Sequence, residues 1–214
     1  MDDRAHLSRR DLPGWFGKLP GTGDFAQRRL SEHFRTVWDS WLQTGLFDLR
    51  NRQPDWVDHY LAGPIWFFAL GPQLAGPSPW LGVMMPSVDS AGRYFPLTLA
   101  IELSEQQAAE RARSQAWARQ WWETSAQAAL AALESDLDAN RFESSLNEAF
   151  GGVDNSQSTG PGVRLPAVCQ SIWRTHPGDD GPPNLIVTGL PTAASFAALF
   201  GYGSDILRAA EISR

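Results

Sequence analysis

The chain has 214 residues and a mass of 23.6 kDa, which is the size of one ordinary domain with a buried core. Its 43% hydrophobic and 20% charged residues exclude a disordered or fibrous chain, and its net charge of −6 argues against a nucleic-acid binder, which needs a basic face. The single cysteine, Cys169, excludes an internal disulfide, and without a long apolar stretch or a secretory signal pattern we expect a cytoplasmic protein with no membrane insertion.

The N-terminal part of the chain predicts a strand and two helices. Residues 14–19 form a short apolar run that ends in a turn containing Pro20 and Gly23. Ser31 is the predicted N-cap of a long helix, because the apolar residues after it recur at helical spacing. These residues are Phe34, Val37, Trp38, Trp41, Leu42 and Leu46. A second, shorter helix is predicted at residues 55–61.

Three apolar runs follow, at residues 65–70, 80–85 and 94–102. Each run is short, bounded by glycine or proline and nearly continuous in hydrophobicity, which is typical of a strand covered on both faces. The link at residues 86–92 is too short for a parallel crossover, so the second and third runs are predicted to form an antiparallel hairpin.

The C-terminal half begins with Ser104 and Gln107, which have the spacing of a helix-capping box. They predict a long alanine-rich helix to residue 139 that breaks near Thr124 and Ser125, and a second helix at 141–150 that stops at Gly151. Strands are predicted at 168–175 and 185–189, and a last helix at 191–200. This order of elements predicts an α/β fold, a layered α/β/α sandwich with a central mixed, partly antiparallel sheet flanked by helices.

All these elements are predicted to belong to one domain spanning residues 1–214. The polar residues 1–13 predict a flexible tail. The run GGVDNSQSTGPG within residues 151–163 has no apolar periodicity and predicts a mobile surface loop.

No convincing catalytic set is present in the sequence. Residues 21–26 match the dinucleotide-binding pattern G-x-G-x-x-A, but Pro20 precedes them and no helix is predicted to open at Gly23, so a tight turn is favoured. The motif G-x-S-x-G is absent, and none of the four histidines has metal-ligand spacing with a second ligand. We therefore expect a protein that is not an enzyme and has no cofactor and no metal.

Charged residues gather around two glycine-containing turns. The first turn carries Lys18, Asp24, Arg28 and Arg29, and the second carries Asp89 and Arg93. If both turns lie at the same edge of the sheet, ion pairs such as Lys18–Asp89 or Asp24–Arg93 would join them. Two interpretations stay open, because such pairs either fix the turn geometry or form part of a binding site.

The ten tryptophans fall into two groups. Trp38 and Trp41 lie on the predicted helical stripe and are expected in the core. Trp15, Trp56 and Trp80 flank predicted loops and are candidates for exposed aromatic anchors of a protein interface.

Several of these segments also resemble one protein family. The segments are GWFGKLPGTGDF at 14–25 with Arg28 and Arg29, WDSWL at 38–42, PIW at 64–66, GVMMPSVD at 82–89 and GRYFP at 92–96. Together they are similar to the TagF/ImpM family of type VI secretion-associated proteins. The similarity continues more weakly through SIWRT at 171–175 and GLP at 189–191.

The resemblance implies a cytoplasmic protein of Gram-negative bacteria that negatively regulates the type VI secretion system after translation. It implies a protein partner, either the forkhead-associated scaffold Fha or another component of the secretion system, and a layered α/β sandwich. It implies no catalytic residues. Candidate partner-binding residues are those of the two turns and the loop-flanking tryptophans: Lys18, Asp24, Arg28, Arg29, Asp89, Arg93, Trp15, Trp56 and Trp80.

Two alternatives stay open at this point. One is an enzyme or a nucleotide or phosphopeptide sensor that uses the glycine loop at residues 21–26. The other is a structural subunit of the secretion apparatus. The sequence does not define the oligomeric state.

Overall fold

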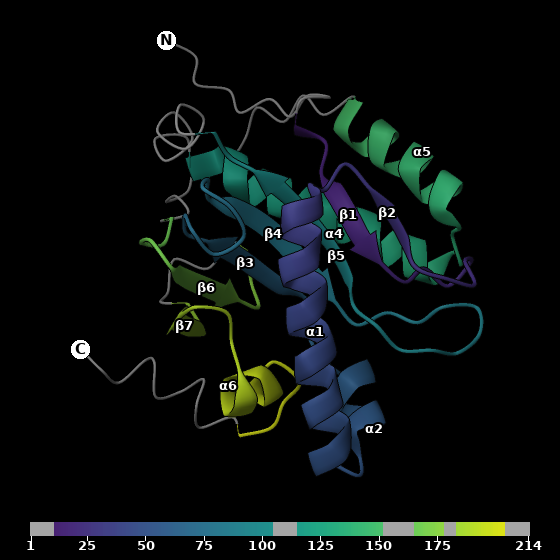
Figure 1. Cartoon of the computed structure of the whole chain (residues 1–214). Coiled ribbons are helices and arrows are strands. Elements are labelled where there is room, and N and C mark those ends of the chain that lie inside the picture. The colour runs from purple at the N-terminus through teal and green to yellow at the C-terminus, as the bar shows by residue number, and fades with distance from the viewer. Residues whose placement is uncertain (1–10, 105–114, 152–164, 178–182, 204–214) are drawn as a thin grey trace.

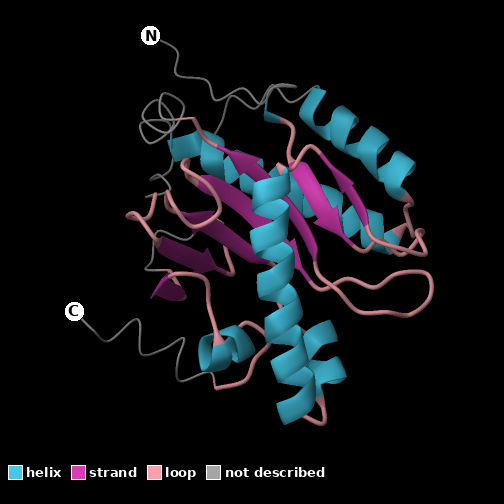
Figure 2. Cartoon of the chain, viewed as in Figure 1, coloured by secondary structure: helices cyan, strands magenta, loops and turns pink. Residues whose placement is uncertain are grey.

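The computed structural model of the chain describes residues 11–104, 115–151, 165–177 and 183–203, and the remaining residues are grey in Figures 1 and 2. Most of the predicted tail and loop lies outside the described residues, as does Gln107 of the predicted capping box.

One seven-stranded sheet forms the centre of the described structure, in the order β2-β1-β5-β4-β3-β6-β7. The strands are β1 (Gly14–Gly17), β2 (Ala26–Arg28), β3 (Trp66–Leu70), β4 (Trp80–Met85), β5 (Leu97–Glu102), β6 (Gln170–Arg174) and β7 (Leu185–Thr188). The predicted hairpin is confirmed as the antiparallel pair β4–β5.

Every neighbouring pair in this sheet is antiparallel, so the prediction of a mixed sheet is wrong. Helical connections suggested parallel neighbours. In the structure, however, the helices after β2 lead to β3, and those after β5 lead to β6, and neither pair of strands is adjacent in the sheet. The strands that are joined through helices are therefore not neighbours in the sheet, and no parallel pair forms.

Three helices pack against one face of the sheet: α1 (Glu32–Arg52), α2 (Trp56–Leu61) and α6 (Ala193–Ala198). The predicted cap of α1 is confirmed, because Ser31 Oγ accepts a hydrogen bond from the Phe34 amide. The buried side of α1 carries the predicted apolar stripe, with Trp38 and Trp41 in the core. Figure 1 shows α1 crossing in front of the sheet.

The opposite face is covered by α4 (Gln115–Glu134) and α5 (Ala139–Gly151). The predicted break at Thr124 and Ser125 is wrong, because α4 continues through both residues. The buried Ser125 lies on a helix that packs most of its surface into the core, and this packing overrides the weak helix propensity of the two residues. The helix ends at Glu134, and Asp136 adopts a φ of 46° in the turn that leads to α5.

The alternation of side chains along the strands divides the core into two halves. In β3, Phe67 and Ala69 face α4, whereas Trp66, Phe68 and Leu70 face α1. All six residues of β4 are buried, as its continuous apolar run predicted.

Candidate functional site

The two glycine-containing turns lie together at one end of the sheet. The Lys18 ammonium donates a hydrogen bond to Asp89 Oδ2, and the two residues are only 4% and 3% exposed, so the predicted Lys18–Asp89 ion pair is confirmed. The Ser90 amide donates to the Thr22 carbonyl oxygen at 3.1 Å. Arg93 donates to the Gly23 carbonyl oxygen, which adds a third link between the turns.

Asp89 is the centre of this network. Its Oδ1 accepts hydrogen bonds from the amides of Ala91 at 3.0 Å and Arg93 at 2.9 Å, and its Oδ2 accepts from Lys18 and from Arg93 Nε, the latter at 2.8 Å. Burial alone would raise the pKa of Asp89, but the hydrogen bonds from Lys18 and Arg93 outweigh burial and hold the pKa well below its usual range. The carboxylate therefore stays ionised and fixes both turns.

A second network ties the start of the sheet to α5. Arg29 donates to the Pro13 carbonyl oxygen from Nε at 3.0 Å and from Nη2 at 2.8 Å, and its guanidinium also pairs with Glu143. Glu143 accepts a further hydrogen bond from Trp15 Nε1 at 3.0 Å. Burial opposes ionisation of Glu143, but these donors lower its pKa. Arg29, whose φ of 60° is unusual for a residue other than glycine, thus has a structural ion pair.

Two of the three loop-flanking tryptophans are not exposed, and the expectation that they lie at the surface is wrong. Trp15 is buried against Phe142 of α5, with ring centroids 5.1 Å apart, and Trp80 is buried against Phe34 of α1 at 4.2 Å. Both tryptophans belong to strands that helices cover, so their closeness to a loop did not predict exposure. Trp56 is partly buried beside Tyr94, and the Arg50 guanidinium lies 5.3 Å from its ring centroid.

Four of the predicted charged residues reach the surface, namely Asp24, Arg28, Arg29 and Arg93. Asp24 accepts a hydrogen bond from the Phe25 amide at 2.7 Å, and Arg93 pairs with Asp89 rather than with Asp24. The Arg28 guanidinium lies 5.8 Å from the Trp15 ring centroid and 3.4 Å from Asn140 Oδ1 of α5. Asp24 and Arg93 therefore lie where the two turns meet, whereas Arg28 lies over Trp15 and toward α5, on the face of the sheet opposite Phe25.

Sequence reasoning missed Phe25, the aromatic residue of the first turn that is 44% exposed. Its ring stacks on Phe16 at 5.7 Å and contacts the edge of Phe95 at 4.8 Å, and the Lys18 ammonium lies 4.9 Å from its centroid. A phenylalanine inside a polar Gly-Asp turn was the available signal. We call the exposed residues Asp24, Phe25 and Arg93 the two-turn surface.

A groove of about 600 Å³ runs from Phe25 along the outer side of α1. Phe16 and Phe25 form its aromatic part. Polar side chains of α1 form the rest, namely Arg35, Thr36, Asp39, Ser40, Gln43 and Thr44. The two-turn surface therefore continues into a groove that offers both aromatic contact and hydrogen-bonding groups.

The glycine loop at residues 21–26 is used for packing. The Gly21 amide donates to the Leu137 carbonyl oxygen at 3.2 Å, and a Cβ at Gly21 would overlap the backbone of the α4–α5 turn. The loop leads into β2 and not into a helix, whereas the dinucleotide-binding motif requires that a helix begin directly after its glycines. Among the described residues, no group of three histidine, cysteine or acidic side chains is placed to hold a metal, and no helix is long and apolar enough to cross a membrane.

Comparison with known proteins identifies the family. Residues 14–149 match the family model described as the TagF N-terminal domain, type VI secretion system-associated. The crystal structure of PA0076 from Pseudomonas aeruginosa PAO1 is similar, with 29% sequence identity and a TM-score of 0.68 over 88% of this chain and 93% of that chain. The curated proteins include no match. The matched residues include both turns and every residue of the two-turn surface, and the chain belongs to the TagF family of type VI secretion system-associated proteins.

Proposed function

We propose that this protein is a non-enzymatic, cytoplasmic negative regulator of the type VI secretion system. It acts after translation by binding a protein partner, such as the forkhead-associated scaffold Fha, through the two-turn surface. Family membership supplies the link to type VI secretion. The observation that supports the binding role is the locked pair of turns, which holds Phe25 and the charged side chains of Asp24 and Arg93 together at the surface.

The locked turns favour binding because they are already ordered. Lys18 and Asp89 are buried and joined, so the loops that display the two-turn surface do not have to be immobilised when a partner arrives. Phe25 offers a large aromatic contact, and the charged side chains of Asp24 and Arg93 lie beside it on the same two turns. Interfaces commonly draw most of their affinity from such an aromatic anchor inside a polar rim.

The binding role is tested by the dissociation constant between the full-length protein and purified Fha. Phe25→Ala is expected to weaken binding at least about tenfold, because it removes the anchor. Leu130→Ala is the matched control, since Leu130 is a similarly exposed apolar residue at 39% on α4 and lies outside this surface. Equal binding by wild type and Phe25→Ala would contradict the two-turn surface as the interface.

The regulatory role is tested in cells that lack the chromosomal copy. Wild-type protein is expected to reduce type VI secretion, whereas Phe25→Ala, produced at the same level, is expected to leave secretion high. Secretion that is unchanged by the wild-type protein would contradict negative regulation. Wild-type repression together with unaltered Fha binding by Phe25→Ala would assign the interface to another surface.

A further inference from the structure

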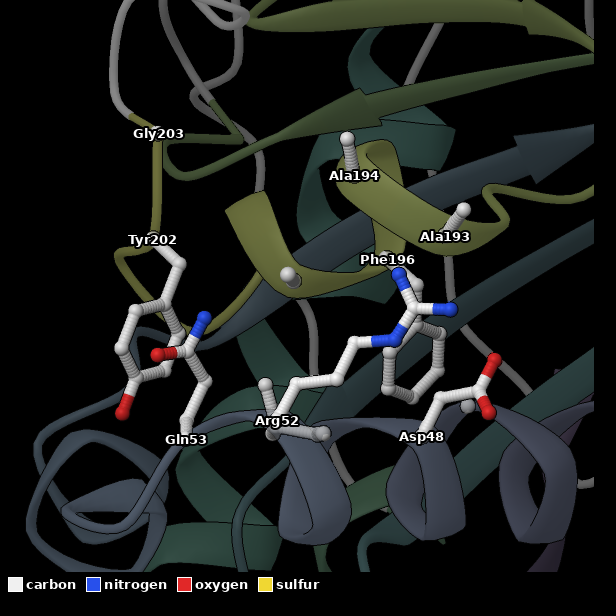
Figure 3. A pocket seen from close by; sticks show the side chains of 11 residues that line it. Asp48, Arg52, Gln53, Ala193, Ala194, Phe196, Tyr202 and Gly203 are labelled. Atoms are coloured by element: carbon white, nitrogen blue, oxygen red, sulfur yellow. The ribbon is translucent and has the colours of Figure 1, made fainter.

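A second concave site lies between the C-terminal half of α1 and α6. It is a cavity of about 270 Å³ (Figure 3). One wall is a helical stripe of α1 with the spacing i, i+3, i+4, i+7, made by Gly45, Asp48, Leu49 and Arg52. The other wall is formed by α6 and the residues after it: Ala193, Ala194, Phe196, Ala197 and Tyr202. The cavity therefore runs along the axis of α1 between two helices.

Both walls of this groove are fixed by contacts. A Cβ at Gly45 would overlap the ring of Phe196, so the glycine seats this ring between the helices. Trp41 Nε1 donates to the Pro191 carbonyl oxygen at 2.6 Å and anchors the segment before α6. Beyond α6, the Tyr202 hydroxyl donates to Asp55 Oδ1 at 2.7 Å, and its ring stacks on His59 at 4.1 Å. The groove is thus preformed.

Two charged side chains at the rim of the cavity have no partner among the described residues. Figure 3 shows Asp48 and Arg52 projecting from α1 toward α6. Neither side chain has a hydrogen bond or an ion pair with a described residue, although the two residues are four apart on one helix. The exposed Arg52 and the partly exposed Asp48 are therefore both available to pair with a partner.

We propose that this groove binds an amphipathic helix of a partner protein, lying antiparallel to α1. A large apolar side chain of that helix enters the cavity, a glutamate pairs with Arg52, and a lysine four residues later pairs with Asp48. This site is separate from the two-turn surface, so the proposal does not depend on the proposed function.

The geometry favours a helix over other occupants. The cavity is smaller than the range of about 300–1,000 Å³ that is usual for small-molecule pockets, but it suits one large apolar side chain. The small residues Ala194 and Ala197 let a helix backbone approach closely, as in helix-in-groove recognition. Antiparallel packing places glutamate before lysine, which is the order that also stabilises the bound helix itself.

The test uses two synthetic 18-residue helical peptides with the same leucine stripe. One carries Glu at position i and Lys at i+4, and the other carries the reverse order. Fluorescence anisotropy with the full-length protein is expected to show about five- to tenfold tighter binding of the Glu-then-Lys peptide, the size expected for two exposed ion pairs. The double substitution Asp48→Arg with Arg52→Asp is expected to reverse this preference.

A cavity-filling variant separates the groove from the charges. Ala194→Phe is expected to abolish binding of both peptides, while Ala91→Phe, at an exposed turn alanine, leaves binding intact. Equal affinity for the two peptides, unchanged by the charge reversal, would overturn the proposal. Binding that appears only after deletion of residues 204–214 would assign the groove to that segment, and self-association that the peptide displaces would assign it to a second copy. Either result overturns the partner helix.

Discussion

Lys18 is the only lysine of the chain, and its ammonium is buried beside Asp89. Lys18→Met removes this partner and leaves the buried carboxylate with Arg93 as its remaining cation. Loss of one member of a buried ion pair typically costs 3–5 kcal/mol, and because Arg93 remains we expect a loss of about 3 kcal/mol in the free energy of unfolding. Urea denaturation measures this loss.

Arg28→Met is the matched control for Lys18→Met, because it removes an exposed cation from the same turn region and is expected to change stability by less than about 0.5 kcal/mol. A double variant with Lys18→Met and Asp89→Asn is expected to cost less than the two single variants added together, since it leaves no buried charge without a partner. Strict additivity would show that the two side chains act independently.

Asp89 also makes the free energy of unfolding depend on pH. Its pKa is lowered in the folded state, since hydrogen bonds from Lys18 and Arg93 outweigh the burial that would raise it. Its stabilising contribution is therefore complete above the unfolded pKa, about 3.9, and is lost as the pH falls below that value toward the folded pKa. Asp89→Asn lacks this contribution at every pH.

We therefore expect the stability difference between wild type and Asp89→Asn to narrow as the pH is lowered from about 6 to about 3. Urea denaturation at each pH provides the measurement. Asp24→Asn, at an exposed carboxylate of the first turn, serves as the control. A difference that stays constant across this range would show that ionisation of Asp89 does not stabilise the fold.

At the scale of the elements, the contact between α1 and α6 depends on a glycine inside a helix. Alanine in place of an exposed helical glycine normally stabilises by up to about 1 kcal/mol. At Gly45 the added Cβ would overlap the Phe196 ring, so Gly45→Ala is expected to destabilise by about 1–3 kcal/mol. In a Phe196→Leu background the smaller side chain leaves room, and the cost of Gly45→Ala is expected to fall. Thermal unfolding of the wild type, the two single variants and the double variant checks this. A melting temperature of Gly45→Ala above that of the wild type would refute the overlap.

Elements with a strong local pattern were predictable, and elements that depend on their neighbours were not. The apolar spacing after Ser31 defined α1, and the apolar run from Trp80 to Met85 defined β4 without error. The three residues of β2 are partly or fully exposed and carry no apolar pattern, so this strand exists only through its pairing with β1. The Thr124-Ser125 pair looked like a helix break, but core packing holds α4 together there.

The same distinction applies to the candidate site. Opposite charges on two turns predicted the Lys18–Asp89 pair, because the turns follow strands that lie close together in the sheet. The burial of Trp15 and Trp80 was not predictable, because it depends on which helix covers each end of a strand. The exposure of Phe25 was not predicted either, because it results from the way the first turn folds over Phe16 and Phe95.

At the scale of the whole molecule, the residues that match the TagF family model do not complete the core. The match ends at residue 149, but β6 pairs with β3 and extends the sheet beyond it. Trp173 of β6 is buried against Trp38, Trp41 and Phe68. Leu199 follows α6, and its carbonyl oxygen accepts a hydrogen bond from Trp66 Nε1 at 2.8 Å. The core beneath α1 is thus built from segments on both sides of residue 149.

A fragment of residues 1–149 is therefore expected not to fold by itself. Without β6, β7 and α6, one edge of β3 is unpaired and the aromatic side chains of α1 lose the cover of Trp173 and Phe196. Near-UV circular dichroism and thermal unfolding of the fragment should show no fixed tryptophan environment and no cooperative transition, in contrast to the full chain. Addition of a second fragment, residues 150–214, is expected to restore both signals, because the missing strands can pair with the open edge. A cooperative transition in the isolated 1–149 fragment would show instead that the core beneath α1 is stable without its C-terminal half.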